Sequence, residues 1–254
     1  MSVEDRYGAQ VESEFLEEIS DTVSELQVIL GNIRSGGVNR QDGFDNFGGQ
    51  LARMRLMGAA SHFPLLDLCV RRVSDYIADP EELSEGNLDD LDVFVDVMSG
   101  LVSGEIPPET DEAEFFRSLP ARRPVDLADV AHLNVEILLV EPNKAGATFI
   151  KRELESGGYK VTAVRRSIEA LVLATRTKPD MVISAAVLDH LSGIDLACAL
   201  AAMPATEKIP FCLVSSFERS NAFVARLPDS AAFLRKGTNF SKDMGDALTR
   251  FGIA

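Results

Sequence analysis

Apolar residues recur at three- and four-residue steps through the first hundred positions of the chain. In the first such segment they are Phe15, Ile19, Val23, Leu26, Leu30 and Ile33. This spacing predicts a long helix with one apolar face. We expect Gly31 and the Ser35-Gly36-Gly37 run to end this helix, because glycine favours the conformation that terminates helices.

Three further segments repeat the helical pattern. The second carries Phe44, Phe47, Leu51, Met54 and Gly58, the third runs from Phe63 to Ile77, and the fourth carries Leu88, Leu91, Val95, Met98 and Val102. The third segment stops before Asp79-Pro80, since a residue that precedes proline disfavours the helical region. The fourth is expected to end at Gly104. Four amphipathic helices joined by short loops predict an all-α antiparallel bundle over residues 1–104.

Residues 105–132 do not continue either pattern. Pro107-Pro108, Pro120 and Pro124 interrupt a stretch that also contains a cluster of acidic residues. Such a composition cannot form one continuous element, so we interpret it as a linker. Phe115-Phe116 and Val125-Asp126-Leu127 could dock as short helices against either neighbouring domain.

From Val135 the period of the pattern changes, because apolar runs of strand length begin to alternate with helical segments. The runs are Val135–Val140, Val161–Val164, Met181–Ser184, Pro210–Ser215 and Ala231–Leu234. The helical segments are Ala145–Glu155, Ser167–Arg176, Gly193–Met203, Glu218–Arg226 and Ser241–Phe251. This alternation predicts an α/β domain over residues 133–254 with a doubly wound, five-stranded parallel sheet. Ligands of such sheets bind at the carboxyl ends of the strands.

The net charge of −15 is unevenly distributed along the chain. Residues 1–104 contain 20 acidic and 7 basic residues and no lysine, whereas residues 133–254 contain 13 acidic and 15 basic residues. This break supports a division into two domains. The acidic excess argues against nucleic acid as a partner, because Lys and Arg supply most of the affinity for phosphates.

Compartment and cofactors follow from what the sequence lacks. No apolar run approaches the ~20 residues that span a bilayer, and the first six residues are too polar for a secretory signal. The isolated Cys69, Cys198 and Cys212 lie in apolar stretches and are interpreted as core residues of a cytoplasmic protein. His132 and His190 have no metal-ligand spacing. We therefore expect no membrane insertion, no metal and no cofactor.

Five short motifs occur in a fixed order in the C-terminal region. They are Ile137–Glu141, Pro179–Ser184, Ser192–Leu196, Ile209-Pro210 followed by Ser215, and Phe233–Lys236. In order and spacing, residues 134–252 resemble the receiver domain of response regulators, the CheY-like members of the flavodoxin-like fold. The resemblance implies a domain that signals through an aspartyl phosphate.

The residues at the resembling positions differ from those of a working receiver. In that family two adjacent acids and an acceptor aspartate hold Mg²⁺, while a Ser/Thr and a lysine bind the phosphoryl oxygens. Here the acid pair is Glu141-Pro142 and the acceptor position falls on Ala185. Ser215 and Lys236 are kept, but Gly237 stands where the family has proline. The resemblance therefore predicts a pseudo-receiver that is not phosphorylated on aspartate.

Two other acids lie near the acceptor position in the sequence. Asp180 starts the third strand at the opposite end of the sheet, and Asp189 belongs to the loop that follows the strand. Both are more simply interpreted as strand-start and turn residues. Lys236 is also accounted for as an ion-pair partner of Glu141.

The second helical segment resembles a different family. Residues 47–60 are similar to the helix of histidine phosphotransfer domains that open chemotaxis kinases, whose hallmark is His-x-x-Lys-Gly. With Gly58 as the anchor, the histidine falls on Met54 and the lysine on Met57, so both functional residues are lost. Arg53 and Arg55 could still present positive charge to an acidic partner.

His62 follows this segment and opens the third helix. It is either a displaced phosphohistidine or, more simply, a capping or surface residue.

These features favour a non-catalytic adaptor or regulator of two-component, chemotaxis-type signalling that acts through protein–protein contacts. The partners implied are histidine kinases, phosphotransfer domains or receiver domains, and a homo-oligomer is possible. The candidate docking surfaces are the bundle's second and third helices and the receiver face of helix 4, strand 5 and helix 5, beside the switch-position aromatic Phe233. Two alternatives stay open: a phosphorelay component that uses His62 or Asp189, and a small-molecule sensor in the vestigial pocket. No motif of a hydrolytic or redox enzyme occurs.

Overall fold

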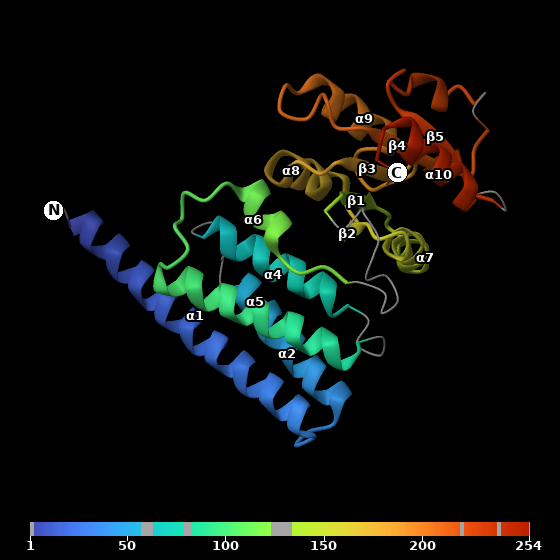
Figure 1. The fold of residues 1–254 in the computed structure, drawn as a ribbon. Coiled ribbons are helices and arrows are strands. Elements are labelled where there is room, and N and C mark those ends of the chain that lie inside the picture. The colour runs from blue at the N-terminus through green and yellow to red at the C-terminus, as the bar shows by residue number, and fades with distance from the viewer. Residues whose placement is uncertain are drawn as a thin grey trace. The chain divides into compact units, whose positions relative to one another are not determined.

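A computed structural model gives the structure of residues 3–56, 63–78, 83–122, 134–218, 221–237 and 240–253, with side chains from Phe15 onward. The chain divides into two compact units, Met1–Pro120 and Ala121–Ala254 (Figure 1). We refer to them as the N-terminal unit and the C-terminal unit.

The N-terminal unit is built from helices. They are α1 (Val3–Ser35), α2 (Arg40–Leu56), α4 (Pro64–Tyr76), α5 (Glu85–Ser103) and α6 (Glu112–Ser118). α1 packs against α2 and α5, while α4 packs against α2, α5 and α6. Their apolar faces meet in a core that includes Phe44, Phe47, Leu51, Met54, Leu68, Leu91, Phe94 and Met98. The all-α architecture predicted for this part of the chain is confirmed.

The first helix does not end where Gly31 predicted. α1 continues through this glycine, and a Cβ added there would meet nothing within 4 Å. The helix ends at Ser35, as the Ser35-Gly36-Gly37 run predicted, and Gly36 follows it with φ +71°. The Gly36 and Gly37 amides donate to the carbonyls of Ile33 and Asn32 at 3.2 and 2.9 Å. A glycine inside a long helix costs only ~1 kcal/mol, which the buried stripe of α1 easily offsets.

Helix α6 extends the N-terminal unit beyond the boundary at residue 104. The Asp111 carboxylate caps the helix by accepting from the amides of Ala113 and Glu114, each at 3.0 Å. Phe116 is buried, and the guanidinium of the equally buried Arg72 lies 4.3 Å from the centre of its ring. The first part of the stretch interpreted as a linker is therefore docked on the bundle.

The C-terminal unit contains one sheet of five parallel strands. The strands are β1 (Glu136–Val140), β2 (Lys160–Val164), β3 (Met181–Ala185), β4 (Phe211–Ser215) and β5 (Ala232–Arg235), in the spatial order β2-β1-β3-β4-β5. The helices are α7 (Lys144–Ser156), α8 (Ser167–Thr177), α9 (Gly193–Ala202) and α10 (Phe240–Arg250). The strand order changes direction between β1 and β3, so the doubly wound parallel sheet predicted from the sequence is confirmed.

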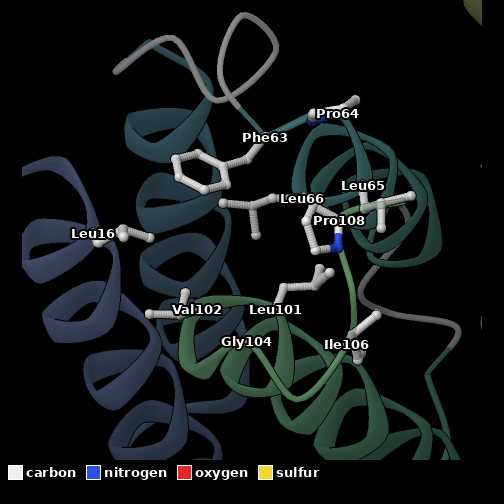
Figure 2. A pocket seen from close by; sticks show the side chains of 10 residues that line it. All are labelled: Leu16, Phe63, Pro64, Leu65, Leu66, Leu101, Val102, Gly104, Ile106 and Pro108. Atoms are coloured by element: carbon white, nitrogen blue, oxygen red, sulfur yellow. The ribbon is translucent and has the colours of Figure 1, made fainter. Parts of the chain in front are cut away.

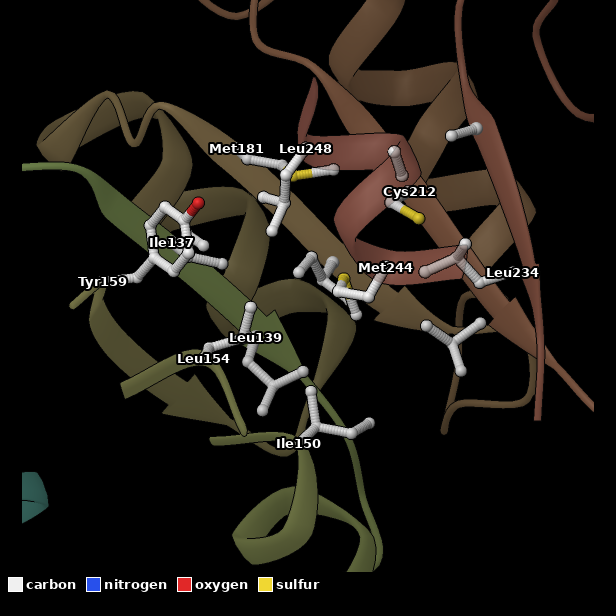
Figure 3. Packing of buried hydrophobic residues seen from close by; sticks show 14 of the residues in the cluster. Ile137, Leu139, Ile150, Leu154, Tyr159, Met181, Cys212, Leu234, Met244 and Leu248 are labelled. Carbon is white, nitrogen blue, oxygen red and sulfur yellow. The ribbon is translucent and has the colours of Figure 1, made fainter. Parts of the chain in front are cut away.

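Alternate strand residues point to the two faces of this sheet. On one face, residues of all five strands pack against α7 and α10 in a buried cluster that includes Ile137, Leu154, Cys212 and Met244 (Figure 3). α8 contacts β1 and α9 contacts β4, and these two helices also contact each other. Residues such as Leu138 and Val182 supply the core on their side.

The helix predicted over Glu218–Arg226 is wrong. In its place the described chain makes bends and turns and only a short 3₁₀ turn, η2 (Val224–Arg226). The Asn221 carboxamide accepts from the Phe223 amide at 2.9 Å, and the Asn221 amide donates to the Glu218 carbonyl. Such local bonds compete with a helix, and Val224 is the one fully buried side chain of this turn.

The cysteines occupy two different environments. Cys69 and Cys212 are buried, as predicted, and burial raises the pKa of the Cys212 thiol to about 12. Cys198 is exposed on α9, so its prediction as a core residue is wrong. Among the described helices, none combines the length and the apolar character that crossing a membrane requires.

Candidate functional site

Four strands end at the same edge of the sheet, and the residues predicted as a vestigial receiver pocket lie there. Glu141 directly follows β1, Ala185 ends β3, Ser215 ends β4, and Lys236 directly follows β5. Because all strands are parallel, their carboxyl ends meet at one edge. The register pairs Val140 with Ser184, Ala185 with Val214 and Ser215 with Arg235. The structure therefore gathers these residues as the sequence predicted.

An ion pair joins the first and last of these strand ends. The Lys236 ammonium donates to the Glu141 carboxylate, with Nζ and Oε2 2.8 Å apart. The glutamate side chain is only 3% exposed, whereas that of the lysine is 43% exposed. The Asn143 amide donates to the other carboxylate oxygen at 3.1 Å. Both oxygens of Glu141 are thus hydrogen-bonded within the protein.

The end of β3 is closely packed and apolar. The side chain of Ala185 is buried, and the next residue donates its amide to the Val214 carbonyl at 2.9 Å. A Cβ added at Gly193 would lie 2.2 Å from the Ala185 carbonyl oxygen, so only glycine fits at the start of α9. The methyl group of Ala185 has no atom that can attack phosphorus or bind a metal.

Ser215 is engaged in the local structure of the β4–β5 edge. Its hydroxyl oxygen accepts from the Phe217 amide at 3.0 Å, and its carbonyl accepts from the Lys236 amide at 2.8 Å. Beside it on β5, Phe233 is half-buried and pairs in register with Leu213. The docking face expected from helix 4, strand 5 and helix 5 lacks its first helix, because η2 is the only helical turn among the residues described between β4 and β5.

The nearby acids lie where the sequence placed them. The Asp180 carboxylate accepts from the Glu136 amide at 2.8 Å, at the end of the sheet opposite to the pocket. Asp189 is exposed in the loop after β3, and its carbonyl accepts from the Ser167 hydroxyl at 2.9 Å. Within the described residues, no three His, Cys, Asp or Glu side chains gather in a way that could hold a metal ion.

The residues of the phosphotransfer interpretation are only partly described. Met54 is completely buried in the bundle core, and a phosphorylatable side chain would need to reach solvent, so its position gives that interpretation no support. Met57, Gly58 and His62 lie outside the described residues. Arg53 is exposed and pairs with Glu18, with Nη2 and Oε1 3.1 Å apart.

Arg55 is exposed as well, and no hydrogen bond or ion pair joins it to another described residue.

Comparisons with known proteins add to this geometry. No protein-family model matches the chain. An 81-residue stretch is 30% identical to the phosphate regulon transcriptional regulatory protein PhoB of Rhizobium meliloti, and it covers 32% of this chain and 36% of that protein. The chain thus matches about a third of the length of this relative.

Solved receiver domains are similar to part of the chain. One, from a sensor histidine kinase of Pseudomonas aeruginosa, shares 24% identity at a TM-score of 0.42, with 46% of this chain and 98% of that chain covered. Chemotaxis response regulator CheY4 of Vibrio cholerae shares 20% identity at 0.42, with the same coverage. The parallel strand order 2-1-3-4-5 is that of CheY and flavodoxin. This order gives the C-terminal unit a flavodoxin-like, doubly wound sheet.

Proposed function

We propose that this protein is a non-catalytic adaptor or regulator of two-component signalling, whose receiver-like unit acts through protein contacts without aspartyl phosphorylation. The observation that carries the proposal is the Glu141–Lys236 ion pair beside Ala185. In a working receiver the lysine meets phosphoryl oxygens; here a carboxylate already neutralises it. Among the described residues, Ala185 therefore offers no nucleophile at the acceptor position, and Lys236 is already paired with Glu141.

The ligands available for Mg²⁺ at this edge of the sheet support the same proposal. Mg²⁺ prefers several oxygen ligands, usually carboxylates, in near-octahedral geometry. At this edge Glu141 supplies one carboxylate, and Pro142 stands at the position of the second acid. The Pro142 carbonyl accepts from the Arg165 side chain at 3.1 Å. A cation entering here would have to displace Lys236 from Glu141.

The test is a titration of the full chain with beryllofluoride and Mg²⁺, followed by amide chemical shifts. We expect no saturable change at Ala185, Ser215 or Lys236. The Pro142→Asp, Ala185→Asp double variant is the matched control, because it restores the missing acids on the same scaffold. Saturable, metal-dependent shifts in the wild-type chain would overturn the proposal.

A phosphorelay that uses His62 or Asp189 predicts a different outcome. Incubation with acetyl phosphate and Mg²⁺ should leave the intact mass unchanged if the chain is an adaptor. A phosphoryl adduct that disappears in Asp189→Asn, or in His62→Gln, would favour the relay instead.

We also propose that exposed side chains of α2 contact the partner. We place Arg53 and Arg55 of α2 at the rim of such a contact, opposite acidic groups of the partner. The Arg53→Ala, Arg55→Ala double variant should lose about 1 kcal/mol of binding free energy. Lys236→Ala should leave binding unchanged. Titration calorimetry at two salt concentrations measures both effects. A loss of binding in Lys236→Ala, with unchanged binding in the double arginine variant, would instead assign the function to the pocket.

A further inference from the structure

The N-terminal unit contains a hollow of about 290 Å³ between the start of α4 and the end of α5 (Figure 2). Leu16 of α1 closes one side, Phe63 and Leu66 form the wall at α4, and Leu101 belongs to the wall at α5. None of the described residues that line the hollow has a charged or hydrogen-bonding side chain. An apolar group that enters such a hollow removes apolar side-chain surface from water, which is favourable.

One wall is formed by residues 104–110, which follow α5 and which we call the strap. Gly104 turns the chain with φ +78°, and the Ile106 amide donates to the Gly100 carbonyl at 3.1 Å. The hydroxyl and amide of Thr110 both donate to the Pro107 carbonyl, at 2.7 and 3.1 Å. These bonds hold Ile106 at the rim of the hollow.

The opposite wall is equally fixed. The Phe63 ring stacks on Phe15, with centroids 5.4 Å apart and an interplanar angle of 5°. Pro64 starts α4 with a restricted φ, and Leu65 and Leu66 are buried against the bundle. Because both walls are held, the hollow is preformed, as ligand pockets usually are.

Charge around the hollow selects among apolar ligands. Glu17 follows Leu16 in α1, and Glu105 and Glu109 belong to the strap; all three are exposed. Residues 1–120 contain 25 acidic and 8 basic residues, a net charge of −17. The potential over this unit therefore opposes an anionic ligand and favours a neutral or cationic one.

We propose that the hollow binds a small hydrophobic ligand of one or two fused rings that is neutral or positively charged. Its volume is about twice the ~150 Å³ of an engineered apolar cavity that binds benzene. The hollow belongs to the N-terminal unit and the receiver-like pocket to the C-terminal unit, so the hollow adds a ligand site to a protein whose proposed function needs none.

The test uses the full chain and three probes that share the indole ring: neutral indole, cationic tryptamine and anionic indole-3-acetate. Methyl resonances of Leu66, Leu101 and Val102 should shift with tryptamine and indole, and more weakly with the anion. Val102→Phe fills the hollow and should weaken binding about tenfold or more. Val93→Phe makes the same change at a 46%-exposed position of the same helix and should bind as wild type does.

Several results would overturn the assignment. Absence of methyl shifts at millimolar probe, or equal shifts in the folded Val102→Phe variant, would show that the hollow takes no such ligand. Equal affinity for indole-3-acetate would refute the charge selection. A wild-type dimer that Val102→Phe converts to a monomer would assign the hollow to a second copy of the chain instead.

Discussion

The two partners of the Glu141–Lys236 ion pair differ in how much water they can reach. Glu141 is buried and cannot turn to solvent, whereas the lysine can. Removing the lysine therefore leaves a buried carboxylate without its cation, while removing the carboxylate leaves a lysine that water can solvate.

The first prediction follows from this asymmetry. Lys236→Ala should lower the free energy of unfolding by ~1–2 kcal/mol, below the value for fully buried pairs because the lysine is 43% exposed. Glu141→Gln keeps a hydrogen-bond acceptor for Asn143 and should cost less. Urea unfolding of both variants measures the difference. A larger loss for Glu141→Gln would contradict this account of the pair.

The cysteines give a second prediction at the residue scale. Burial holds the pKa of Cys212 at about 12 and raises that of Cys69, so both stay protonated and inert near neutral pH. Iodoacetamide should therefore label Cys198 alone in the native chain, as peptide mapping would show. Labelling of Cys69 or Cys212 at a comparable rate would mean that the native core opens readily.

The spacing of the sequence motifs correctly placed the residues at the strand ends. It did not correctly predict which side chains are buried in every case. Glu141, Ala185, Ser215 and Lys236 lie where the motifs placed them, because strand ends of a parallel sheet are fixed by short, well-marked runs. Cys198 was misplaced because its neighbours on α9 are mostly alanines, which look apolar in sequence but are too small to cover it.

At the scale of elements, the periodic segments were predicted well and the weakly periodic ones were not. Each strand and the helices α7 to α10 lie within two residues of the predicted ranges. The segment at Glu218–Arg226 failed because local side-chain bonds outweighed a weak apolar pattern. From the sequence, the docking of α6 could not be assigned to either domain. Its partner Arg72 is of a residue type that is usually exposed.

The third prediction tests that docking. Phe116→Ala should lower the stability of the N-terminal unit by about 3 kcal/mol, because it removes a buried ring and leaves Arg72 without its cover. Phe149→Ala makes the same change at a 54%-exposed position of α7 and should have little effect. Denaturant unfolding followed by circular dichroism compares them. Equal losses would exclude α6 from the bundle core.

At the scale of the whole molecule, the two units differ in net charge. Residues 1–120 carry −17 and residues 121–254 carry +2. Self-repulsion therefore destabilises the first unit and hardly affects the second.

The fourth prediction is a salt-dependent separation of two thermal transitions. Raising the ionic strength from ~0.1 M to ~1 M shortens the Debye length from ~10 to ~3 Å. The transition of the N-terminal unit should move up by a few degrees, while that of the C-terminal unit serves as the internal control. Scanning calorimetry of the full chain shows both. Equal shifts would refute the charge argument, and a single transition would refute independent units.

The ion pair also has a consequence for the order in which the chain folds. Its partners are 95 residues apart, and it joins the first strand to the last. Loop closure over such a distance is entropically expensive, so the contact forms after the sheet is largely assembled. Interactions that are absent from the folding transition state affect the unfolding rate and leave the folding rate nearly unchanged. Loss of this contact should therefore speed unfolding of the C-terminal unit and leave its folding rate nearly unchanged. The ion pair would then contribute to the kinetic stability of this unit.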